Sequence, residues 1–70
     1  MDSNQHHLYN FVFYLIHASP ECKYKHKDKI CDTVKRLGKE AVLDELIKQG
    51  KDTLHFTEAV IMARTIRDIE

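Results

Sequence analysis

Residues 8–16 read LYNFVFYLI, and Asn10 is the one position in this run without a large apolar or aromatic side chain. On a helix the run divides into two neighbouring rows, which are Leu8, Phe11, Val12 and Leu15 on one side and Tyr9, Phe13 and Ile16 on the next. A helix that is apolar over so wide an arc is buried on more than one side. Residues 2–18 are therefore predicted to form a central helix, and this run decides the fold.

The second row of this helix is the first candidate functional surface. It either completes the core or packs on a partner protein or a second copy of the chain. The partner-binding hypothesis assigns the contact to four residues, Tyr9, Phe13, Tyr14 and Ile16. A β-strand over residues 11–16 is the alternative secondary structure, because these residue types are also common in strands.

One proline and two glycines divide the chain where helix boundaries are expected. Ser19-Pro20-Glu21 is typical of a helix start, because serine caps early backbone N–H groups and proline fits the first helical position. Gly38 and Gly50 are predicted to end helices, since glycine takes the left-handed conformation at low cost. A break at Gly38 is also indicated by the apolar pattern, which changes phase there.

Two amphipathic helices are predicted in the second half of the chain. The first, over residues 39–49, has an apolar face made of Val42, Leu43, Leu46 and Ile47. The second is expected to begin near Asp52 or Thr53. Its apolar residues are Phe56, Ala59, Val60, Met62, Ala63, Ile66 and Ile69.

The segment that follows Pro20 is harder to assign. Ile30, Val34 and Leu37 form one helical stripe, but the same stripe reaches lysines when it is followed back before residue 30. Residues 20–29 are therefore either a solvated helical turn or a loop after which Asp28 caps the next helix.

The chain has 70 residues, with 11 lysines and arginines against 11 aspartates and glutamates. This length fits one domain over residues 1–70, and the predicted elements make it all-α, a small bundle of three to four short helices. The net charge is zero, so the chain lacks the strong overall positive charge that is typical of histone-like and heparin-binding proteins. Two cysteines are too few for a disulfide scaffold, so a reduced, cytoplasmic protein is expected. The run at 8–16 is too short to span a bilayer.

A basic segment provides the second candidate surface and an alternative function. Its members would contact the phosphates of a nucleic acid, with one ring stacking on bases, and they are Lys23, Tyr24, Lys25, Lys27, Lys29, Lys35, Arg36 and Lys39. On a helix the four alternating lysines fall into two separate stripes, and a single arginine is available to read a base edge. A solvated surface is therefore the competing interpretation.

Four side chains of zinc-ligand type lie close together in the sequence, namely His17, Cys22, His26 and Cys31. They lack the C-x₂-C spacing of common zinc sites, and on one helix Cys31 points away from the face shared by Cys22 and His26. Nine helical residues also separate the two cysteine α-carbons by about 13 Å, too far for a disulfide. We expect no metal and no cofactor.

The sequence lacks familiar catalytic motifs, including G-x-S-x-G, a glycine-rich phosphate loop and H-E-x-x-H. We expect a non-enzymatic protein-interaction or regulatory module, such as an adaptor or inhibitor of a larger protein, that also self-associates. Nucleic-acid binding by the basic segment is the alternative. Salt separates the two hypotheses, because phosphate contacts lose affinity steeply as salt rises and apolar contacts do not. Five histidines make self-association sensitive to pH near neutrality.

Overall fold

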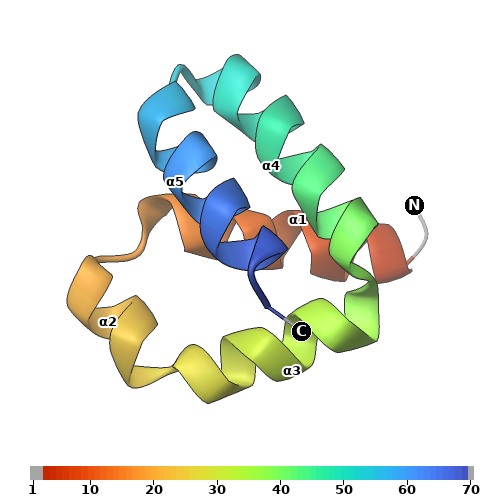
Figure 1. Cartoon of the computed structure of the whole chain (residues 1–70). Coiled ribbons are helices and arrows are strands. Elements are labelled where there is room, and N and C mark those ends of the chain that lie inside the picture. Colours follow the sequence, from red (N-terminus) through yellow and green to blue (C-terminus); the bar gives the residue numbers. More distant parts are fainter. Residues whose placement is uncertain (1–2, 70) are drawn as a thin grey trace.

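The chain folds into five α-helices across the part that the computed structural model describes, which is the backbone of residues 3–69 and the side chains of residues 5–69. The helices are α1 (Ser3–His17), α2 (Pro20–Lys25), α3 (Lys27–Leu37), α4 (Lys39–Thr53) and α5 (Phe56–Arg67) (Figure 1). These residues contain no strand, so the all-α class is confirmed and the strand alternative for residues 11–16 is wrong. The number exceeds the predicted three to four helices because the second segment forms two short ones. Asp2, included in the first predicted helix, lies outside the described residues.

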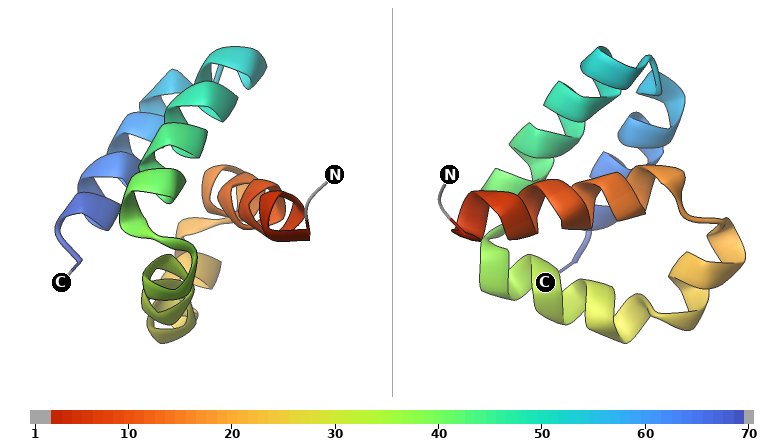
Figure 2. Two further views of the ribbon diagram at one scale, coloured as in Figure 1. Left: turned by 90° about the vertical axis from the view of Figure 1, so that its right-hand side faces the viewer. Right: turned by 180° about the vertical axis from the view of Figure 1, so that it is seen from behind.

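The helices α4 and α5 form an antiparallel hairpin, and α1 crosses one face of it (Figure 2). The helix α3 packs beside the first half of α4, and α2 connects α1 to α3 at an outer corner of the molecule (Figure 1). The radius of gyration is 11.1 Å. A compact folded chain of this length is expected to have a radius of gyration of about 11 Å, so the five helices pack as closely as in an ordinary globular domain.

The core lies where α1, α3, α4 and α5 meet. Its fully buried side chains are Val12, Leu15, Val34, Val42, Leu46 and Ile66. Leu8 and Phe11 pack against this cluster, so the first predicted row of α1 faces the core. Ile16 is only 6% exposed and also belongs to the core. Its prediction as a partner-binding residue is therefore wrong, because the α4–α5 hairpin covers more of α1 than a single row.

The start of α2 agrees with the sequence prediction. Ser19 Oγ accepts a hydrogen bond from the backbone N–H of Cys22 at 3.2 Å, and Pro20 is the first helical residue. The helix stops after six residues and buries none of them, so residues 20–29 include the solvated helical turn that was one of two predictions. Asp28 lies in the first turn of α3, where it is not the cap, and the loop alternative is wrong.

The two glycines differ in what they do. Gly38 has a φ of 101° and separates α3 from α4, which confirms the predicted break. Gly50 lies inside α4, so the predicted helix end there is wrong. A β-carbon on Gly50 would stand 2.7 Å from the β-carbon of Ala59 in α5. Glycine is therefore required at this position by the close approach of two helices.

Because α4 continues past Gly50, the last helix begins later than predicted. Thr53 belongs to α4, and its hydroxyl donates to the carbonyl of Gln49 at 2.6 Å. The left-handed residue that ends α4 is Leu54, with a φ of 60°. The first residue of α5 is Phe56, so the expectation of a cap at Asp52 or Thr53 is wrong.

Candidate protein interface

A row of aromatic side chains runs along the exposed side of α1. Tyr9 and Phe13 are 49% and 45% exposed, and their ring centres are 6.4 Å apart in a stacked arrangement. His17 lies 4.1 Å beyond Phe13, and its ring meets that of His55 edge-on at 4.9 Å. The spacing of four residues places three of these rings on one helix face. Tyr9, Phe13, His17 and His55 are called the aromatic row below.

The segment of α1 that carries the aromatic row has no residue of fixed charge. From residue 3 to residue 20 the sequence contains no aspartate, glutamate, lysine or arginine, although 31% of the whole chain is charged. On α1 itself, the exposed residues beside the row are therefore amides and histidines, such as Gln5, His6 and Asn10. Protein interfaces are similarly depleted in charge at their centre and enriched in aromatic residues.

A buried glutamine holds α1 in position on α4. The Nε2 of Gln49 donates to the backbone carbonyl of Tyr9 at 3.1 Å and to Glu45 Oε1 at 3.3 Å. This bond ties the middle of α1 to α4 at the residue that begins the aromatic row. The sequence pattern alone does not indicate a buried role for Gln49, because a glutamine at the end of an amphipathic helix is usually exposed.

The turn between α4 and α5 adds an exposed apolar residue next to the aromatic row. Leu54, which precedes His55, is 81% exposed although it is a large aliphatic residue. Its left-handed backbone is rarely adopted by any residue with a bulky side chain, and this conformation costs about 1–2 kcal/mol. Leu54, His17 and His55 were all missed as members of this surface. The spacing of four residues from Tyr9 through Phe13 is the signal that points to His17.

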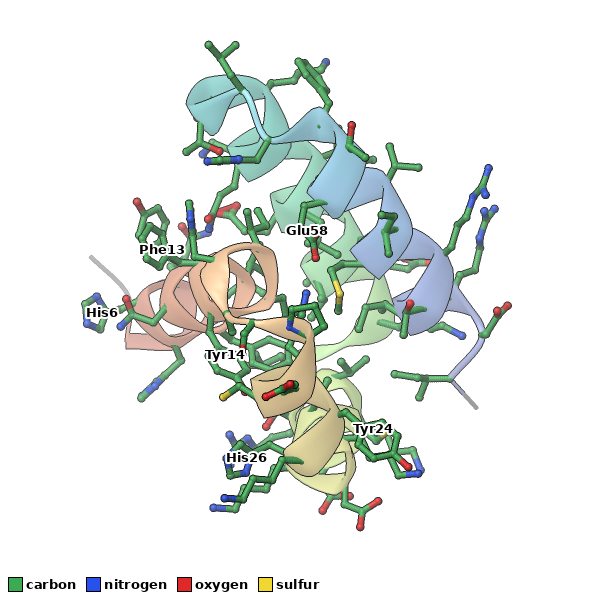
Figure 3. The ribbon with its side chains drawn as sticks, turned by 90° about the vertical axis from the view of Figure 1, so that its left-hand side faces the viewer. His6, Phe13, Tyr14, Tyr24, His26 and Glu58 are labelled. Carbon is green, nitrogen blue, oxygen red and sulfur yellow. The ribbon has the colours of Figure 1, made fainter. Side chains whose placement is uncertain are left out.

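Tyr14 does not belong to this surface. Figure 3 shows Tyr14 on the side of α1 that faces α2, whereas Phe13 points in another direction. The hydroxyl of Tyr14 and the sulfur of Cys22 are hydrogen-bonded at 3.4 Å. This bond, together with burial and the charge interaction with Cys22, raises the pKa of Tyr14 above its ordinary value of 10.0. Tyr14 thus connects α1 to α2 instead of lining the same face as Phe13.

The basic segment is divided between structural and exposed lysines. Lys23 is 11% exposed, and its Nζ donates to Glu58 Oε1 of α5 at 2.5 Å and to the carbonyl of Leu15 at 3.1 Å. Lys39 Nζ donates to the carbonyl of Ile69 at 2.5 Å and is half-buried. These two lysines are engaged within the fold, so the predicted nucleic-acid surface does not include them as free cations.

The remaining members of the basic segment are exposed on α2 and α3. They are Tyr24, Lys25, Lys27, Lys29, Lys35 and Arg36. Tyr24 lies on the outside of the molecule (Figure 3). Its ring is 75% exposed, and Lys27 Nζ lies 5.2 Å from the ring centre. Asp28 and Asp32 are exposed among these cations. The surface of α2 and α3 is therefore a mixture of both charges rather than a continuous positive patch.

The four candidate metal ligands are not assembled into one site. His17 belongs to the aromatic row, and the sulfur of Cys22 is hydrogen-bonded to the hydroxyl of Tyr14. His26 is exposed between α2 and α3 (Figure 3). Cys31 is a free, half-buried thiol on α3. Among the residues that the structure describes, no three histidine, cysteine, aspartate or glutamate side chains are placed to hold a metal ion.

Comparison of the chain with protein-family models, with curated proteins and with solved structures finds no match. The functional interpretation therefore depends on the geometry of the chain itself. Within residues 3–69, none of the helices has both the length and the apolar character that crossing a membrane requires.

Proposed function

We propose that this chain is a non-enzymatic protein-interaction module that self-associates through the aromatic row, in the manner of a small adaptor or inhibitor. The observation that supports the proposal is the exposure of Tyr9 and Phe13 on a helix without a single charged residue of fixed sign. Aromatic side chains bury a large area per residue and dominate the energetics of interfaces. Two free cysteines fit a reducing compartment, for which we propose the cytoplasm.

A second copy of the chain is the proposed occupant because of the charge of this face. In a two-fold dimer the same patch contacts itself, so a fixed charge near the axis would meet a like charge, and a fixed charge elsewhere would need an opposite charge on the same patch. The aromatic row avoids this repulsion while the histidines are neutral. A domain of 70 residues also has a small core and gains stability when a partner covers apolar surface.

The proposal is tested by sedimentation velocity on three proteins at increasing concentration and at pH 7.5. The wild type is expected to dimerise, and Phe13→Asp is expected to remain a monomer because two carboxylates would face each other across the interface. Tyr24→Asp is the matched control, since it replaces an exposed ring on α2 and should dimerise as the wild type does. Circular dichroism establishes that both variants fold, as expected for half-exposed or exposed positions.

Two results would contradict self-association by this row. One is a wild type that sediments as a monomer up to millimolar concentration, and the other is equal behaviour of the two variants. Acidification provides a second measurement. The chain contains five histidines, and histidine as a residue class gains positive charge as the pH falls from 8 to 5, so two copies of the chain repel each other more strongly at the lower pH. Dimerisation should therefore weaken as the pH falls through this range.

Nucleic-acid binding has less support than the sequence alone indicated. Two of the seven cations, Lys23 and Lys39, are occupied within the fold, and the exposed ones are interspersed with Asp28 and Asp32. A phosphate backbone would meet these carboxylates as well. Binding of DNA or RNA that disappears steeply with added salt is the result that would favour this alternative.

A further inference from the structure

A second apolar surface lies on the α4–α5 hairpin and is separate from the aromatic row. It is a groove of about 330 Å³ lined by Ile47, Phe56, Ala59, Val60, Ala63, Arg64 and Arg67. Ile47, Phe56 and Val60 are each about half exposed, so large apolar side chains line an open space. Met62 and Ile66 of α5 belong to the core and do not line the groove, whereas the buried Ala59 and the half-buried Ala63 lie between the core and the groove.

The polarity of this groove changes along α5. Phe56 and Val60 are about one turn apart, and the same stripe reaches Arg64 after one further turn and Arg67 after about two. The one ion pair found among the described residues joins Lys23 to Glu58, so neither arginine is paired with a described carboxylate. One end of the groove is therefore apolar, and the other end carries two positive charges.

We infer that this groove binds an acidic amphipathic helix of a partner protein. The apolar end would take up aliphatic side chains of the ligand, while the planar guanidinium groups of Arg64 and Arg67 bind its carboxylates, which they can do in bidentate fashion. Seven residues separate Val60 from Arg67, a distance of about 10 Å along a helix. Phe56, Val60, Arg64 and Arg67 follow the spacing i, i+4, i+8 and i+11, and a ligand helix with apolar residues at i and i+4 and carboxylates at i+8 and i+11 has the same spacing.

The charges also argue for a partner of different composition from this chain. A second copy would bring its own arginines to the groove if the same faces met, whereas an acidic helix complements them. The aromatic row and the groove share no residue, so a substitution in one leaves the side chains of the other unchanged. Loss of one binding activity would leave the other intact.

The test uses a synthetic helical peptide with leucines at positions i and i+4 and glutamates at i+8 and i+11, on an alanine and glutamine background. Titration is followed by backbone amide chemical shifts and by fluorescence anisotropy. Shifts are expected at Ile47, Val60 and Ala63, with at least a tenfold weaker affinity for a peptide that has glutamine in place of both glutamates. The double variant R64E/R67E should lose the acidic peptide and bind a peptide with lysines at i+8 and i+11.

A matched control variant reverses two positive charges on α3, outside the groove, as R64E/R67E does inside it. The double variant K35E/R36E on α3 should bind the acidic peptide within twofold of the wild type, because both residues are exposed and far from the groove in sequence. Any of four results overturns the inference. The first two are an absence of chemical-shift changes in the groove at millimolar peptide and an equal affinity for the acidic and the glutamine peptides. The other two are a loss of affinity for the acidic peptide in K35E/R36E as large as in R64E/R67E, and groove shifts that change with protein concentration when no peptide is present. The last would show that a second copy occupies the groove. Failure of the Phe13→Asp test leaves all of these outcomes unaffected.

Discussion

Replacing Lys23 by alanine should destabilise the fold much more than replacing its neighbour Lys25. Lys23 Nζ is bonded to Glu58 Oε1 at 2.5 Å, to the carbonyl of Leu15 at 3.1 Å, and to the sulfur of Met62 at 3.4 Å. The three partners lie on α1 and α5, whereas Lys23 lies on α2, a helix that buries none of its own residues. Lys23 is therefore the main polar attachment of α2 to the rest of the molecule.

The size of the effect follows from the partial burial of this ion pair. The side chain of Lys23 is 11% exposed and that of Glu58 is 36% exposed. Exposed pairs contribute up to about 1 kcal/mol, and breaking a buried pair costs about 3–5 kcal/mol, so an intermediate value applies here. Together with the lost carbonyl bond, we expect Lys23→Ala to reduce the free energy of unfolding by roughly 2 kcal/mol. A small domain then unfolds at about 2 M less urea.

The assay is urea unfolding followed by circular dichroism for wild type, Lys23→Ala and Lys25→Ala. Lys25 is exposed on the same short helix, so its replacement should change the free energy of unfolding by less than about 0.5 kcal/mol. A double-mutant cycle with Glu58→Ala should give a coupling energy of about 1 kcal/mol or more. Equal losses in the two lysine variants, or a coupling energy near zero, would refute the structural role of Lys23.

Three further predictions concern the helix contacts. Gly50→Ala should lower stability by about 1–2 kcal/mol in thermal unfolding despite the better helix propensity of alanine, because its β-carbon meets that of Ala59 at 2.7 Å; Ala59→Gly in the same chain should restore part of the loss. Leu54→Gly should raise stability by up to about 1 kcal/mol, since glycine relieves the left-handed strain, and a loss would contradict this. Tyr14→Phe should be less stable than wild type at neutral pH. Because the pKa of Tyr14 is raised in the folded state, its hydrogen bond to Cys22 stabilises the fold fully below the unfolded-state value of 10.0, and this difference should disappear as the pH rises through the folded-state pKa.

Local sequence patterns were sufficient for the helices but not for every boundary. The core-facing row of α1, which is Leu8, Phe11, Val12 and Leu15, and the break at Gly38 follow from spacing and backbone preference, and both predictions are confirmed. Gly50 was misread because its role depends on Ala59, which becomes its neighbour only when α4 and α5 pack together. The same glycine preference applies to helix ends and to close helix contacts, so sequence alone does not separate them.

The candidate sites show the same limit. Lys23 belongs to an alternating run of lysines that is typical of solvated surface, yet its partner Glu58 lies 35 residues further along the chain. Ile16 lies on the predicted outer row, but the hairpin of α4 and α5 extends far enough to bury it. Conversely, Tyr9 and Phe13 are exposed as their row predicts, and whether they bind a partner stays a prediction.

Self-association through α1 is tested most directly by an isotope-filtered NOE experiment on a mixture of labelled and unlabelled chains at pH 7.5. Such spectra report only contacts between different molecules. We predict intermolecular contacts from the ring protons of Phe13 and Tyr9 to α1 of the second copy. A concentrated sample without intermolecular contacts, or with contacts that arise only from other faces, would contradict the proposed interface.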